Sequence, residues 1–135
     1  MTVRIQPSPF LRKALRADAL ISAASGAVMV FGADALAPLT GLPATLLLVA
    51  GLSLIPFVAF VAWLSGRPSV PAAMVWAVIV LNVAWAIDCA WIGLGAGLAP
   101  TRLGIGFLAM QAAAVLVLAE LEFTGLRRAG SPALA

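Results

Sequence analysis

Apolar residues form four long blocks along the chain, separated by short connections that contain proline, glycine or polar residues. The blocks lie at 17–37, 43–64, 71–94 and 103–124. A helix over each block would be about 31–36 Å long, enough to cross a hydrocarbon layer of about 30 Å with modest tilt. The pattern therefore predicts an all-α membrane protein with four transmembrane helices.

The connections between the blocks are short, which favours antiparallel neighbours. We therefore expect a single domain over 1–135, folded as an up-down-up-down antiparallel bundle. Ser8 and Pro9 have the residue types of a helix N-cap and first helical position. They predict that residues 1–16 extend the first helix into the cytoplasm, whereas 125–135 are expected to form a cytoplasmic tail.

The composition supports lipid rather than water as the surrounding solvent. Apolar residues make up 64% of the chain and charged residues only 10%, against roughly half and a quarter in soluble domains. The net charge is +3, and the charges lie at the ends of the apolar blocks. This arrangement argues against nucleic acid as a partner and is typical of cytoplasmic anchoring.

The basic residues predict the orientation. If the N-terminus is cytoplasmic, every basic residue except Arg102 lies on the cytoplasmic side, as the positive-inside rule requires. Both termini are then cytoplasmic. The alanine-rich composition and compact loops favour a multi-pass protein of the bacterial inner membrane.

Absent residue types narrow the possible chemistry. The chain has no histidine and a single cysteine, Cys89. An intrachain disulfide is therefore excluded, and the commonest haem, zinc and copper ligand is missing, as is the commonest general base. We predict no metal, no cofactor and no catalytic residue, and we expect Cys89 to be buried.

Asp88 is the sharpest functional candidate, because it lies about 9 Å inside the outer end of the third block. A carboxylate at this depth must face protein or water, or carry a proton. It would act either as a proton or cation site or as a structural group that hydrogen-bonds within the bundle or pairs with Arg102. The structural role is favoured, and replacement by leucine is then expected to destabilise the protein.

Other polar side chains fall at membrane depth near Asp88. Gln111 and Ser53 lie at similar depth, and Asn82 lies closer to the midplane. Together the four residues predict a polar cluster, formed either around a pocket that opens to the outside or by interhelical hydrogen bonds. The hydrogen-bonding role is narrowly favoured, because amide and hydroxyl groups commonly join membrane helices.

The remaining acidic residues near the cytoplasmic ends are Asp18, Glu120 and Glu122. We expect them to form interfacial ion pairs with nearby arginines. A catalytic pair at Glu120 and Glu122 is not expected, because residues two apart on a helix point to different faces.

Several stretches resemble a set of small four-helix bacterial integral membrane proteins without assigned function. They lie at 15–26, 41–43, 51–52, 56–57 and 119–128. This resemblance covers nearly the whole chain and implies no catalytic or binding residue. The size and layout also resemble DoxX-like proteins and small multidrug-resistance proteins, although the first helix lacks the central glutamate of the latter.

Three functions follow as hypotheses. The leading one is a non-enzymatic accessory or structural subunit that packs against other membrane proteins or against further copies of itself. The second is a small oligomeric transporter or ion pathway that uses Asp88. The third is a lipid-, quinone- or pigment-binding membrane subunit, with Trp85 and grooves between small residues as the binding surface.

Overall fold

The computed structural model of the protein describes residues 3–129, and within them the regular secondary structure is helical apart from one short strand pair. Four of its helices are long and apolar enough to cross a membrane. This confirms the predicted all-α membrane class. The elements in chain order are β1 (Arg4–Ile5), α1 (Pro9–Phe31), α2 (Ala33–Thr40), α3 (Ala44–Ser65), β2 (Val70–Pro71), α4 (Ala72–Leu94) and α5 (Arg102–Ala129).

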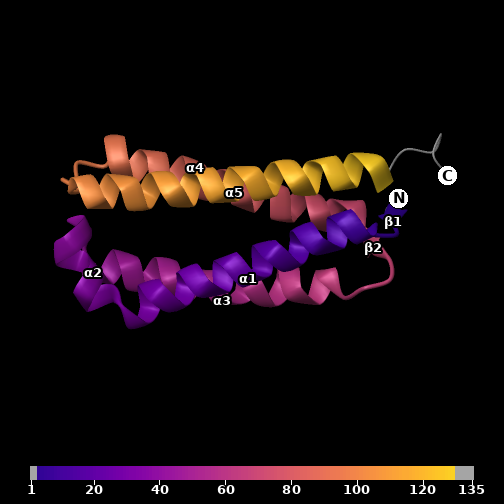
Figure 1. Cartoon of the computed structure of the whole chain (residues 1–135), viewed down its shortest axis with the longest axis horizontal. Coiled ribbons are helices and arrows are strands. Elements are labelled where there is room, and N and C mark those ends of the chain that lie inside the picture. Colours follow the sequence, from indigo (N-terminus) through magenta and orange to yellow (C-terminus); the bar gives the residue numbers. More distant parts are fainter. Residues whose placement is uncertain (1–2, 130–135) are drawn as a thin grey trace.

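The helices lie in two layers along a common long axis (Figure 1). One layer contains α1, α2 and α3, and the other contains α4 and α5. The main contact between the layers joins α1 to α5. The strand pair and the end of α5 lie at one end of the molecule, which we call the terminal end; α2 and the α4–α5 connection lie at the opposite end.

The first apolar block forms two helices, so the prediction of one helix over 17–37 is wrong. α1 begins at Pro9, where Ser8 caps it by accepting a hydrogen bond from the Leu11 amide at 3.1 Å. The helix ends at Phe31, before Gly32, where an added Cβ would lie 2.6 Å from the Val28 carbonyl oxygen. The chain restarts as α2 and turns at Gly41, whose φ of 72° suits glycine.

Both predicted cytoplasmic segments also differ from the structure. Residues 1–16 are not one helical extension, because Arg4 and Ile5 pair antiparallel with Pro71 and Val70. The arginine side chain of this strand donates to the Ser69 hydroxyl at 3.1 Å, which ties the strand to the α3–α4 connection. The predicted tail at 125–135 begins as helix, since α5 continues to Ala129; residues 130–135 lie outside the described part.

The buried apolar side chains form two separate clusters, one toward each end of the molecule. The cluster at the terminal end includes Leu11, Leu15, Val61, Val75 and Leu126. The cluster at the opposite end includes Met29, Leu47, Leu54, Cys89 and Leu108. A cavity lies in the middle of the bundle, between these clusters.

Candidate functional site

A cavity of about 480 Å³ lies between the two layers, and we call it the central cleft. All four long helices contribute to its wall. The lining is largely apolar, and its polar members are Ser22, Ser25, Ser53, Asn82, Trp85 and Gln111. A mainly apolar cavity of this size with a few polar groups has the character of a small-molecule site.

The central cleft lies between the two apolar clusters and opens to the side of the bundle. On α1, Ser22 follows the residues of the terminal cluster and precedes Met29 of the other cluster. Three residues of the cleft wall are exposed on the surface of the bundle, namely Ile21, Pro56 and Leu81.

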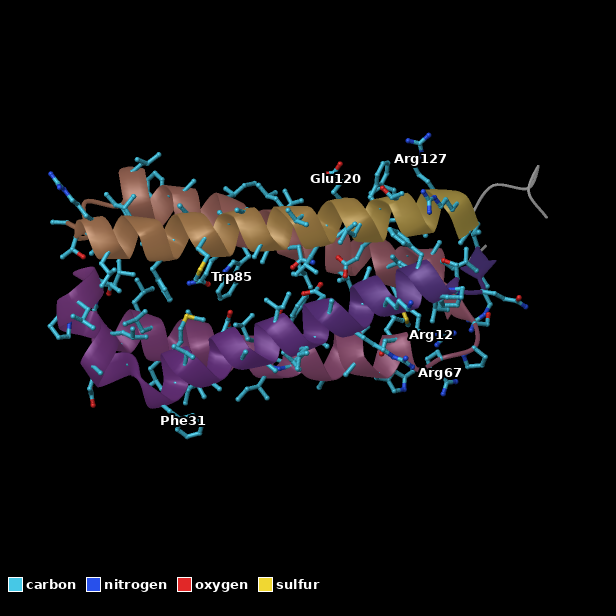
Figure 2. The ribbon with its side chains drawn as sticks, in the orientation of Figure 1. Arg12, Phe31, Arg67, Trp85, Glu120 and Arg127 are labelled. Atoms are coloured by element: carbon cyan, nitrogen blue, oxygen red, sulfur yellow. The ribbon has the colours of Figure 1, made fainter. Side chains whose placement is uncertain are left out.

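A second cavity of about 240 Å³ adjoins the central cleft. The two cavities share Ser53, Trp85 and Gln111. Trp85 points into the space between the two layers (Figure 2), and its indole N–H donates to Gln111 Oε1 at 3.0 Å. This hydrogen bond joins α4 to α5 where the cavities meet.

The structure brings only part of the predicted polar cluster together. Asp88, Gln111 and Ser53 line the second cavity, but Asn82 does not. Asp88 is exposed, and in the described part of the chain its carboxyl group makes no side-chain hydrogen bond and no ion pair with Arg102. The Ser53 hydroxyl donates to its own helix, to the Ala50 carbonyl at 2.6 Å.

Asn82 instead belongs to a buried polar network that sequence analysis did not predict. Its Nδ2 atom donates to Asp18 Oδ2 at 2.7 Å and to Glu122 Oε1 at 2.9 Å. The Ser22 hydroxyl donates to Asp18 Oδ1 at 3.1 Å. We call these four residues the acidic network; it joins α1, α4 and α5.

The acidic network corrects the expectation that Asp18 and Glu122 form interfacial ion pairs. Both side chains have 0% exposure, and none of the described basic residues reaches either carboxyl group. Glu120 is exposed and points away from the other layer (Figure 2). The two glutamates thus lie on different faces of α5.

A signal for this network was present in the sequence. Asp18 lies nine residues after the start of α1, Asn82 lies ten residues after the start of α4, and Glu122 lies seven residues before the end of α5. All three helix ends lie at the terminal end of the molecule. At 1.5 Å per residue the side chains come to similar depth, but depth alone does not show that they face one another.

Cys89 is buried, as predicted, and lines the second cavity. Comparisons with protein families, with curated proteins and with solved structures gave no match. The resemblance to small four-helix bacterial membrane proteins therefore stays a prediction. The function has to be argued from the central cleft and the acidic network themselves.

Proposed function

We propose that this chain is a non-enzymatic integral membrane protein that binds a lipid-soluble small molecule in the central cleft. The cavity of about 480 Å³ between the layers is the observation that carries the proposal. Its wall is mainly apolar and opens toward the lipid-facing surface, so that the ligand would enter from the bilayer. This favours the third hypothesis from the sequence, a lipid-, quinone- or pigment-binding subunit.

The polar groups of the cleft indicate what the ligand would carry. Gln111 uses Oε1 to accept from Trp85, and its amide nitrogen has two further N–H donors. Within the described residues these N–H groups make no side-chain hydrogen bond. They would suit a carbonyl or ester oxygen on an otherwise apolar molecule, a chemistry that quinones and glycerolipids share.

A cleft-filling substitution tests this proposal. We expect Ala114→Phe to weaken binding of a short-chain quinone by about tenfold, roughly 1.4 kcal/mol, because Ala114 lines the cleft. Binding would be followed as saturable quenching of Trp85 fluorescence in lipid nanodiscs, after replacement of the other tryptophans by phenylalanine. Brominated phospholipid as quencher distinguishes a lipid occupant from a quinone.

Ala113→Phe is the matched control, because Ala113 is exposed and is not part of the cleft wall. It adds the same ring to the same helix and should leave the quenching curve unchanged. Equal quenching in both variants, with either quencher, would overturn the proposal.

We further propose that the four long helices cross the bacterial inner membrane in up-down-up-down order, with both termini cytoplasmic. The strand pair and the end of α5 lie at the same end of the molecule (Figure 1). Basic side chains gather at that end, where Arg12 donates to the backbone carbonyls of Ser65 and Arg67. Arg102 begins α5 at the opposite end.

Reporter fusions test this orientation. A reporter after Ala135 and a reporter inserted in the α4–α5 connection, at 95–101, should lie on opposite sides of the membrane. A phosphatase and a fluorescent protein, each active on one side only, give complementary signals at the two positions. The same location for both positions would contradict the four-span arrangement.

The other two hypotheses stay predictions. An accessory role beside other membrane proteins is compatible with the exposed apolar faces of all four long helices. A transport pathway through Asp88 would use the second cavity, which that residue lines. Neither hypothesis has structural support comparable to that which the central cleft gives to ligand binding. A search for membrane proteins that co-purify in mild detergent is the direct test of the accessory role.

A further inference from the structure

Two carboxyl groups and one carboxamide meet in the interior of the bundle without a positive charge. Asp18 comes from α1, Glu122 from α5 and Asn82 from α4. The exposed fractions of the three side chains are 0%, 0% and 2%. Since one nitrogen atom, Asn82 Nδ2, donates to both carboxyl groups, the two acids are immediate neighbours.

The hydrogen bonds of the acidic network leave one carboxyl oxygen without a donor. Asn82 Nδ2 carries two hydrogens, and each is used by one carboxyl group. Asp18 receives a second donor, the Ser22 hydroxyl. Glu122 Oε2 is buried and has no hydrogen-bond partner among the described residues, so the network lacks one donor.

The carboxyl groups themselves can supply the missing contact. Both carboxyl groups accept from the same nitrogen atom, Asn82 Nδ2, so they are close neighbours, and a direct hydrogen bond between them would give Glu122 Oε2 a partner. Two carboxyl groups can make such a bond only when one carries a proton and donates it, because an ionised carboxylate is an acceptor only. A bound proton therefore completes the network and removes one of two like charges that would otherwise repel in a medium of low dielectric constant.

No other charged group along the packed helices substitutes for this proton. α3 has no titratable residue, and the remaining acids of α4 and α5, Asp88 and Glu120, are exposed. On α1, Lys13 and Arg16 are exposed, and Arg12 is engaged with the carbonyls at the end of α3. The basic residues of α5 are Arg102, Arg127 and Arg128, all of them exposed.

We propose that Asp18, Asn82 and Glu122 form a proton-binding site in which the two carboxyl groups hold one proton at neutral pH. Binding converts two carboxylates into one carboxylic acid and one carboxylate, and the proton comes from water as hydronium. Ser22 and Asn82 line the central cleft, which places the site beside a path for exchange. Proton binding at this site does not require that a ligand occupies the cleft.

Infrared spectroscopy tests this proposal directly. We expect the full chain in nanodiscs at neutral pH to show a protonated-carboxyl C=O band that disappears on titration to strongly alkaline pH. Glu122→Gln should remove the band, because an amide replaces the acid while keeping hydrogen bonds to its neighbours. Glu120→Gln removes an exposed acid two residues away and should leave the band unchanged.

Isotope labelling covers the case in which Glu122→Gln fails to fold. The chain has glutamate only at 120 and 122, so ¹³C-carboxyl glutamate or ¹³C-carboxyl aspartate in the unaltered protein should shift the band. A downshift with either label supports the site, because the proton is shared. Absence of a protonated-carboxyl band at neutral pH, or a band that neither label shifts, would overturn it. Loss of the band on addition of sodium chloride at constant pH would also overturn it, since the site would then bind a metal cation.

Discussion

Replacement of Asn82 by leucine is expected to lower the free energy of unfolding by about 3 kcal/mol or more. The two side chains are similar in size, so the change removes polar contacts without forcing the helices apart. Asp18 and Glu122 would each lose the Nδ2 donor and remain buried with fewer partners. Unfolding in mixed detergent micelles, followed by helical circular dichroism, measures the loss.

Asp88→Leu is the matched control on the same helix. Asp88 is exposed and makes no side-chain hydrogen bond in the described region, so we now expect a change within about 0.5 kcal/mol. The sequence predicts that leucine at 88 destabilises the protein, because it places the carboxyl group among hydrogen-bond partners, whereas in the structure Asp88 is exposed. A similar loss for both variants would contradict the role assigned to Asn82.

A triple variant shows whether the stability loss in Asn82→Leu comes from the lost hydrogen bonds themselves or from buried carboxyl groups left without partners. Replacing Asp18, Asn82 and Glu122 together by leucine removes the whole polar set rather than one member of it. Buried polar networks replaced in this way by apolar side chains are often as stable as before. We expect the triple variant to unfold at a higher temperature than Asn82→Leu alone, which would show that the loss comes from the unpartnered acids.

Gly125→Leu is expected to destabilise the protein by about 3 kcal/mol through overpacking. Gly125 allows α5 to lie directly against α1, since an added Cβ would be 2.9 Å from Leu11 Cβ and 3.1 Å from Leu11 Cα. A leucine side chain at this position must push the two layers apart. Because the contact is close in sequence to Glu122, the same displacement would loosen the acidic network.

Gly106→Leu provides the comparison within α5. An added Cβ there meets no atom within 4 Å, so the substitution has room. Leucine is a better helix former than glycine by roughly 0.5–1 kcal/mol, and the control should be neutral or slightly stabilising. If the two variants unfolded at the same temperature, the result would contradict a close contact between α1 and α5 at Gly125.

The positions of most helices can be predicted from the lengths of the apolar blocks and from the residue types at the helix ends. The Ser8–Pro9 start signal marked the first residue of α1, and α3 and α4 begin and end within a residue of the predicted blocks at 43–64 and 71–94. The sequence does not predict the break at Gly32, because a single glycine is tolerated within a helical pattern, although Gly32 and Asp34 do interrupt the apolar stretch there. The extension of α5 past Gly125 was missed because glycine at a helix end usually stops it, whereas this glycine is needed for packing.

The candidate site was less predictable. The position of Asp88 inside an apolar stretch predicts a buried acid, whereas the arginines near Asp18 and Glu122 in the sequence predict interfacial carboxylates. The structure reverses these assignments: Asp88 is exposed and the other two have 0% exposure. Sequence distance from a helix end gives the depth of a side chain, but the direction in which it points depends on the rotation of each helix.

Apolar length, the absence of histidine and the distribution of basic residues are properties of the chain alone, and the first of them predicts the four long apolar helices that the structure contains. The partners of each polar side chain were decided only when the helices packed. Packing sets the rotation of α1, α4 and α5 about their axes, through close contacts such as that of Gly125 with Leu11. That rotation turns Asp18, Asn82 and Glu122 inward to one point, and no local pattern along a single helix contains this information.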